Sequence, residues 1–220
     1  MKRLFQMLVL VLPLAASAQV VKLEGAKVHQ YKQVGEAKLF LHAFNPKGHK
    51  ASDRRPAIVF FFGGGWNGGT PKQFDPHCRY LASRGMVAIT AEYRVKSRNK
   101  TTPFECVKDG KSAIRWVREN AGKLGVDAKR VAAGGGSAGG HVAAATGNCP
   151  GLEEEGENLK VSSKPDVLVL FNPVYDNSSK GFGHDRVKPR WKEISPIHNI
   201  RKGAPPTIVF LGTKDKLIPV

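Results

Sequence analysis

One short stretch of this sequence has the residue types and the spacing of a nucleophilic site. Residues 134–141 read Gly-Gly-Gly-Ser-Ala-Gly-Gly-His, so Ser137 has a glycine two positions away on each side. The apolar residues 131–133 come directly before it, which indicates a strand that turns sharply into a helix. Glycines leave room for so tight a turn, and the first N–H groups of the helix point at whatever the serine attacks. The pattern predicts a nucleophile elbow with Ser137 as the nucleophile, although glycine-rich turns of this kind also bind phosphates.

Alternating strands and helices must position this turn. Short apolar runs predict buried strands at 57–62, 86–91, 130–133, 166–171 and 206–211. Two runs of alternating pattern, 27–34 and 37–44, flank a Gly-Glu turn and predict an antiparallel hairpin. We therefore expect an α/β fold with three layers, in which a mostly parallel sheet carries helices on both faces and an antiparallel hairpin at its N-terminal end.

Helix starts and one irregular segment complete this pattern. Residues 70–73 and 102–105 both read Thr-Pro-x-Gln/Glu, which predicts a capping box at the start of a helix. These helices are expected to end near Gly85 and Gly122. Residues 174–204 have no clean period, and we interpret them as an insertion of the kind that covers active sites.

The N-terminal residues have the composition of a targeting signal. Lys2 and Arg3 precede an apolar run at 4–14, and Ala16-Ser17-Ala18 is a typical cleavage site. We predict a signal peptide at 1–18, cleavage near Ala18, and a secreted or periplasmic protein with one domain at 19–220. The sequence has no apolar run long enough for a membrane span.

Composition limits the partners. The formal net charge is +17, from 35 Lys and Arg against 18 Asp and Glu, which raises the question of a polyanionic partner. The basic residues are scattered, however, and the densest run, 47–55, has no interleaved aromatic residues. We interpret the charge as a solvated basic surface and expect no nucleic-acid partner. The oligomeric state is left open.

Cysteine and histidine patterns indicate neither a metal site nor a cofactor. The three cysteines, Cys78, Cys106 and Cys149, allow one disulfide whose pairing cannot be deduced from their spacing. The sequence has no Cys-x-x-Cys, and its seven histidines lack the spacing of metal ligands.

Together the motifs resemble a known family. Gly63-Gly64-Gly65 follows one buried strand, the Ser137 elbow follows another, and an acidic residue follows a later one. In this order, residues 27–220 resemble the α/β-hydrolase fold. Within that fold they are similar to the esterase/lipase branch related to hormone-sensitive lipase and to polysaccharide acetyl and feruloyl esterases.

The resemblance implies roles for individual residues. The backbone N–H groups of Gly64, Gly65 and Ala138 match the oxyanion hole, and Asp215 matches the acid of the catalytic triad. Asp176, which follows the preceding strand, is the second candidate for the acid.

Two positions depart from the pattern of the resembled family. Phe62 stands where a histidine usually precedes the glycines, so packing has to hold the loop. Gly136 stands where many relatives carry an acidic residue before the nucleophile. We expect Trp66 to pack under the glycine loop and Arg94 to pair with a neighbouring carboxylate.

The general base is not found among the expected positions. In this fold the triad histidine follows the acid, and no histidine follows Asp215. His141 lies on the elbow helix, and His184 and His198 lie in the irregular insertion, so none of them is expected to be the base. We expect the sequence to be incomplete at its C-terminus, with the final strand, the final helix and the triad histidine beyond Val220, and these 220 residues alone to have little or no activity.

These observations lead to one expected function and two alternatives. The expected function is an exported serine carboxylic-ester hydrolase that forms an acyl-enzyme and acts on short acyl esters, such as acetyl or feruloyl groups on polysaccharide. The alternatives are an exported peptidase or amidase of the same fold and a non-catalytic binding protein that has lost its triad.

Overall fold

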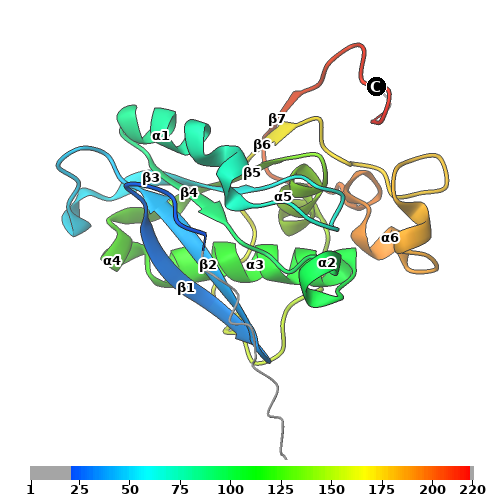
Figure 1. The fold of residues 1–220 in the computed structure, drawn as a ribbon, viewed down its shortest axis with the longest axis horizontal. Coiled ribbons are helices and arrows are strands. Elements are labelled where there is room, and N and C mark those ends of the chain that lie inside the picture. Colours follow the sequence, from blue (N-terminus) through cyan, green and yellow to red (C-terminus); the bar gives the residue numbers. More distant parts are fainter. Residues whose placement is uncertain (1–20, 219–220) are drawn as a thin grey trace, which may run out of the picture.

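The computed structural model describes residues 21–218, and the expected signal peptide, residues 1–18, lies outside the described residues. Seven strands and six α-helices alternate along this part of the chain (Figure 1). The strands are β1 (Lys27–Val34), β2 (Ala37–Phe44), β3 (Arg55–Phe61), β4 (Val87–Ala91), β5 (Val126–Gly136), β6 (Val167–Phe171) and β7 (Thr207–Phe210). The helices are α1 (Asp75–Ser83), α2 (Lys96–Asn99), α3 (Pro103–Glu119), α4 (Ala121–Leu124), α5 (Ala138–Asn148) and α6 (Trp191–Ile194).

The strands form one sheet in the order β1-β2-β4-β3-β5-β6-β7. The hairpin β1–β2 and the pair β2–β4 are antiparallel, whereas β4, β3, β5, β6 and β7 run parallel to one another. This confirms the predicted hairpin and the predicted parallel sheet. Because the parallel strands end at one edge, the loops after β3, β5 and β7 meet at that edge.

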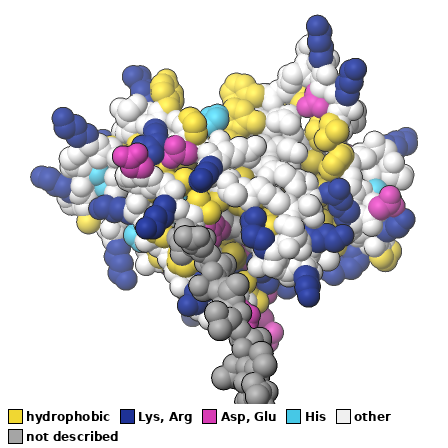
Figure 2. Space-filling model, in the orientation of Figure 1, with side chains coloured by type: hydrophobic (Ala, Val, Ile, Leu, Met, Phe, Trp, Pro, Cys, Tyr) yellow, Lys and Arg dark blue, Asp and Glu magenta, His cyan; other side chains and the backbone are white. Residues whose placement is uncertain are grey.

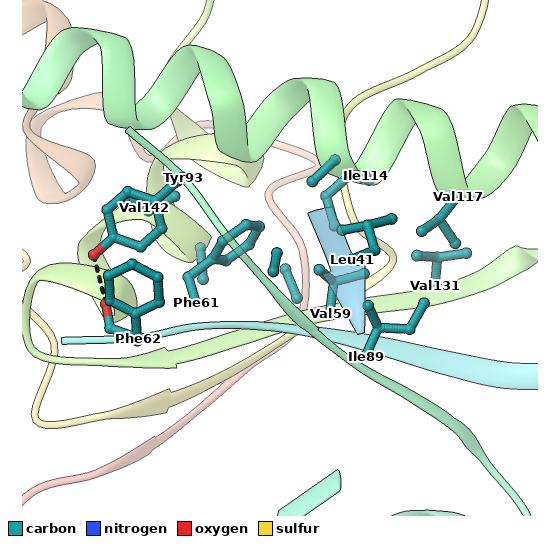
Figure 3. Packing of buried hydrophobic residues seen from close by; sticks show 14 of the residues in the cluster. Leu41, Val59, Phe61, Phe62, Ile89, Tyr93, Ile114, Val117, Val131 and Val142 are labelled. Carbon is teal, nitrogen blue, oxygen red and sulfur yellow. Dashed lines mark hydrogen bonds between the residues drawn. The ribbon is translucent and has the colours of Figure 1, made fainter. Parts of the chain in front are cut away.

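Successive residues of each central strand face opposite sides of the sheet. On β3, Ile58 and Phe60 pack against α1, while Val59 and Phe61 pack against the layer formed by α3 and α5. All four side chains are buried, which is why the run from 57 to 62 is apolar throughout. Figure 3 shows the second layer, where Ile114 of α3 lies against the strand residues.

The two predicted capping boxes have different outcomes. At α3 the box is present, because the Thr102 hydroxyl accepts a hydrogen bond from Phe104 N–H and Glu105 accepts one from Thr102 N–H at 2.7 Å. At Thr70 the prediction is wrong. Its side chain makes no capping hydrogen bond, residues 71–74 form a 3₁₀ turn, and the α-helix starts only at Asp75. The helix predicted to stop at Gly122 ends at Glu119, and α4 then runs through Gly122.

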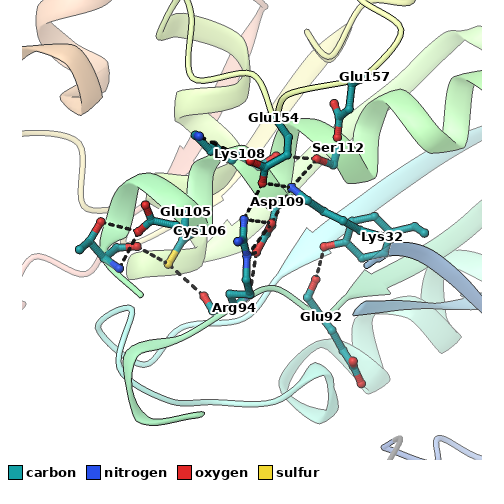
Figure 4. Close-up of polar contacts among 12 residues, drawn as sticks. Lys32, Glu92, Arg94, Glu105, Cys106, Lys108, Asp109, Ser112, Glu154 and Glu157 are labelled. Carbon is teal, nitrogen blue, oxygen red and sulfur yellow. Dashed lines mark hydrogen bonds and ion pairs between the residues drawn. The ribbon is translucent and has the colours of Figure 1, made fainter. Parts of the chain in front are cut away.

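Ion pairs fasten the acidic connection after α5 to the buried face of α3 (Figure 4). Asp109 is fully buried and contacts Lys32 at 2.7 Å and Arg94 at 2.7 Å, which confirms the pairing expected for Arg94. Glu154 joins the same two cations, at 2.8 Å and 2.7 Å. Burial opposes its ionisation, but the hydrogen bond from Lys32 and the nearby positive charges outweigh it and lower the pKa of Glu154 to about 2.

The face of the molecule seen in Figure 2 is rich in basic side chains, and Lys and Arg are spread over it. At the sheet edge, Ile208, Val209 and Phe210 of β7 are about half exposed, so the strand predicted at 206–211 is present but its predicted burial is wrong. None of the helices in residues 21–218 is both long and apolar enough to cross a membrane. The three cysteines are buried free thiols, and burial raises the pKa of Cys149 to about 12.

Candidate active site

Ser137 lies at a sharp corner between β5 and α5. Its backbone has φ 53° and ψ −121°, a conformation that non-glycine residues rarely adopt. Two glycines permit this corner. A Cβ atom on Gly139 would lie 2.1 Å from the carbonyl oxygen of Phe61, and one on Gly135 would lie 2.4 Å from that of Gly139. The helix therefore passes as close to the strands as the nucleophile elbow requires.

The glycine loop that follows β3 packs beside this corner. A Cβ atom built on Gly63 would lie 3.3 Å from Cβ of Ser137. The next residues adopt left-handed backbone conformations, with φ of 128° at Gly64, 60° at Gly65 and 56° at Trp66. Glycine adopts positive φ readily, but Trp66 is strained, and strained backbone of this kind concentrates at functional sites, where the surrounding structure has to hold it in place.

Three backbone N–H groups remain available at this corner. Among residues 21–218, the N–H groups of Gly64, Gly65 and Ala138 donate to no other protein group. Ala138 is the first residue of α5, so its N–H has no acceptor within the helix. Gly64 is exposed and Gly65 half-buried, so incoming molecules can reach the loop. Backbone N–H groups that have no protein acceptor can stabilise an oxygen that becomes negatively charged.

Several side chains hold the glycine loop in place, although Phe62 stands where a histidine usually precedes the glycines. Phe62 stacks on Tyr93 with the ring centres 4.2 Å apart, and the Tyr93 hydroxyl donates to the Phe62 carbonyl at 2.5 Å (Figure 3). Gln73 accepts the Gly63 N–H at 2.5 Å. Arg186 donates to the Gly65 carbonyl at 2.6 Å. The packing expected for Phe62 is present, and hydrogen bonds from three separate elements add to it.

His141 joins the loop, the elbow helix and the insertion. The Trp66 indole N–H donates to Nδ1 of His141 at 3.2 Å, and Nε2 of His141 donates to the Ile194 carbonyl at 2.9 Å. Since the indole only donates and the carbonyl only accepts, the imidazole is neutral with its proton on Nε2. Complete burial lowers the pKa of His141 to about 4. Both ring nitrogens are engaged, so His141 is unavailable as a base for Ser137, and Trp66 packs under the loop as expected.

Asp215 lies in the loop after β7, at the same edge of the sheet as the elbow. Its carboxylate accepts hydrogen bonds from the N–H groups of Leu217 at 2.8 Å and Ile218 at 2.9 Å. The hydrogen bonds from Ile218 and Leu217 lower the pKa of Asp215. Strand β7 is two strands from β5, which is roughly 10 Å at the usual strand spacing. Neither Ser137 nor any histidine contacts this carboxylate among the described residues.

The second acid candidate and the insertion histidines make local contacts instead. Asp176 accepts from the N–H and the hydroxyl of Ser178, at 2.7 Å and 2.9 Å. Its carboxylate lies 3.7 Å from His198 Nδ1, which is also 2.9 Å from the Ser195 hydroxyl. His184 donates to the Asn177 carbonyl. Among residues 21–218, no histidine hydrogen-bonds to the Ser137 hydroxyl, and no group of three His, Cys, Asp or Glu side chains suitable for a metal ion occurs.

Sequence reasoning missed Gln73 and Arg186 as residues that support the site. Gln73 had a plausible local role as a capping residue, and nothing in its neighbourhood indicated a contact with Gly63. Arg186 is 121 positions from Gly65 in the chain. A single sequence carries no pattern for a contact at that distance.

A mixed sheet with a nucleophile elbow after β5 and a glycine loop after the neighbouring β3 defines an α/β-hydrolase. The BD-FAE family model matches residues 41–179, and the chain belongs to this family.

Named relatives agree with this assignment. Esterase LipC of Mycobacterium tuberculosis is 30% identical over 189 residues, which cover 75% of this chain and 45% of LipC. The arylesterase of Saccharolobus solfataricus is 37% identical over 133 residues, covering 59% of this chain and 40% of that protein. The structure of Thermogutta terrifontis esterase 2 phosphoramylated by tabun superposes with a TM-score of 0.87 and 49% identity, covering 90% of this chain and 75% of that one. The chain thus spans less than half the length of the curated relatives LipC and arylesterase.

Proposed function

We propose that the protein is an exported serine carboxylic-ester hydrolase that works through an acyl-enzyme. The observation that carries this proposal is the strained Ser137 beside a glycine loop, with the N–H groups of Gly64, Gly65 and Ala138 donating to no protein group among residues 21–218. Its relatives include esterases, and solved structures of Thermogutta terrifontis esterase 2 carry phosphoryl groups from organophosphates such as paraoxon.

The reaction follows from the chemistry of an ester carbonyl. The Ser137 oxygen attacks the carbonyl carbon while a base takes its proton, and the carbonyl oxygen becomes negative. The N–H groups of Gly64, Gly65 and Ala138 stabilise this oxygen, the alcohol leaves, and water then releases the acid from the serine. Each such donor lowers the free-energy barrier by about 3–4 kcal/mol. In this proposal Asp215 orients a histidine base, which residues 21–218 do not provide.

Short acyl groups are the proposed substrates, with acetyl or feruloyl esters of polysaccharides as the preferred class. Structures of Thermogutta terrifontis esterase 2 hold propionate and butyrate, which supports a preference for short chains. The predicted signal peptide at 1–18 supports an extracellular or periplasmic substrate. N-terminal sequencing of the exported protein should start near Gln19.

The test compares esters with amides on the full-length protein expressed in an exporting host. We expect hydrolysis of p-nitrophenyl acetate and butyrate, slow or no hydrolysis of aminoacyl p-nitroanilides, and a loss of roughly 10⁴–10⁶-fold in Ser137→Ala. Faster cleavage of the anilides would indicate the peptidase alternative. Equal rates of ester hydrolysis for the protein and for Ser137→Ala would favour the non-catalytic alternative.

A further inference from the structure

A cleft of about 440 Å³ opens next to the glycine loop. Gly65 and Trp66 form one wall, the segment around α2 forms another, and Asp185 and Arg186 of the insertion close the third side. Three segments that are distant in sequence therefore meet around one space. Because Gly65 is an oxyanion donor in the proposed function, the cleft borders the reacting end of the site.

The cleft is close to the nucleophile. Gly63 packs directly against Ser137, as its Cβ position 3.3 Å from Cβ of Ser137 shows, and Gly65 is two residues further along the loop. Two Cα–Cα steps span at most about 7–8 Å. An ester held at Ser137 by the loop amides can therefore place one of its substituents in the cleft.

The walls of the cleft carry positive charge without a counterion. Lys96, Lys100 and Arg186 line it, and among the described residues none of them forms an ion pair with a carboxylate. The single acidic residue in the lining, Asp185, is already paired with Lys188 at 2.6 Å. Arg186 donates one N–H to the Gly65 carbonyl, and a guanidinium has further donors for a second partner.

We propose that this cleft is a subsite for a carboxylate carried by the ester substrate, on either its alcohol or its acyl part. The proposal rests on the proposed esterase function and narrows its substrate class. Two ammonium groups and one guanidinium around a cavity next to Gly65 supply charge of the required sign and donors for both carboxylate oxygens.

The kinetic test uses pairs of substrates that differ only in charge. For the alcohol side the pair is 4-acetoxybenzoate and 4-acetoxybenzamide, and for the acyl side it is p-nitrophenyl hemiglutarate and its terminal amide, p-nitrophenyl 4-carbamoylbutanoate. We expect one charged ester to lose about 3- to 10-fold in kcat/KM in the double variant Lys96→Gln, Lys100→Gln, while its neutral partner is unchanged. The charged ester that responds identifies the side, and the effect should shrink in 0.5 M NaCl.

A matched control removes the same charge elsewhere. Lys123 and Lys202 are exposed and do not line the cleft, so the double variant Lys123→Gln, Lys202→Gln should leave both pairs unchanged. An equal effect of both double variants, or none in either, would overturn the subsite.

A binding measurement separates this proposal from the proposed function. Calorimetry with Ser137→Ala and 4-hydroxybenzoate or glutarate needs no turnover, and the cleft variant should raise Kd by a similar 3- to 10-fold. If no ester is hydrolysed but Kd depends on Lys96 and Lys100, the esterase proposal fails and the anion site stands. If Kd is insensitive to both lysines, the anion site is wrong whatever the rates on neutral esters.

Discussion

Ser137 owes its position to residues that have almost no side chain. The corner places a serine at φ 53°, and the adjacent Gly135 and Gly139 let backbone approach backbone where a methyl group would collide. Both the predicted elbow and its glycines follow from local geometry alone, which is why the sequence is sufficient to identify them.

Gly139→Ala tests that packing. The added methyl group would lie 2.1 Å from the Phe61 carbonyl oxygen and 2.3 Å from that of Phe62, and this strand backbone cannot move aside without a large loss of stability. We expect a loss of about 3 kcal/mol or more in the free energy of unfolding, at the upper end of single-substitution effects. Gly122→Ala is the control, because nothing lies within 4 Å of that position. In α4 it should be neutral or stabilise by about 0.4–1 kcal/mol, as urea denaturation can measure.

His141 predicts a particular dependence of stability on pH. Its folded pKa of about 4 lies below the unfolded value of about 6.5, so the unfolded chain binds more protons between these limits. The neutral imidazole therefore contributes fully above pH 6.5, and stability falls as the pH drops from 6.5 to 4, by up to roughly 3 kcal/mol.

In His141→Gln this dependence of stability on pH should weaken. The control variant His198→Gln changes a partly exposed ring and should retain the dependence. Urea denaturation between pH 4 and pH 7 measures both. An unchanged slope in His141→Gln would contradict the burial and the proton assignment of this ring.

At the scale of elements, sequence patterns predict secondary structure reliably where interactions within the segment determine its conformation. The positions of the strands and the hairpin were predictable, because apolar runs and alternating runs have few other folded arrangements. The burial predicted for 206–211 is wrong, because β7 is the last strand of the sheet among residues 21–218 and its residues are exposed. The same Thr-Pro-x-Gln/Glu signature succeeded at Thr102 and failed at Thr70, because the Gln73 side chain bonds Gly63 of the site instead of its own helix. Such competition between local and distant partners is not visible in a single sequence.

The ion-pair network of α3 is another arrangement that only the fold brings together. Asp109→Ala should leave Lys32 and Arg94 buried with fewer counter-charges, at a cost of about 3–5 kcal/mol. Asp185→Ala removes an exposed ion pair and should cost at most about 1 kcal/mol. Thermal or urea unfolding of the two variants gives the comparison, and equal losses would show that the buried network contributes no more than a surface pair.

At the scale of the molecule, β7 is the last strand of the sheet formed by residues 21–218, and most of its side chains are apolar. Strand β7 pairs with β6 on one side, and Ile208, Val209 and Phe210 are 48–49% exposed. A largely apolar hollow of about 690 Å³, lined in part by Phe60 and Phe210, lies on the α1 side of the same strands. An exposed strand edge with apolar side chains is a ready template for pairing with another chain.

We therefore expect the purified 220-residue chain to self-associate in a concentration-dependent way. Ile208→Lys places a charge on the edge and should shift the chain toward monomer, whereas Leu159→Lys, at an exposed leucine away from this edge, should not. Light scattering after size-exclusion chromatography measures the mass. If the unchanged chain is a monomer at all concentrations, the exposed β7 strand does not mediate self-association.

The central claim is that Ser137 is the nucleophile of an esterase, and one labelling experiment tests it most directly. The native protein, captured from its source cells with an antibody to residues 21–218, is treated with a fluorophosphonate and digested with trypsin. Cleavage after Arg130 and Lys160 releases a peptide whose one serine is Ser137. We predict a phosphonyl adduct on that serine that forms within minutes and is lost when the protein is first unfolded. A protein that hydrolyses esters while this peptide stays unlabelled, or that carries the adduct on another residue, would contradict the account.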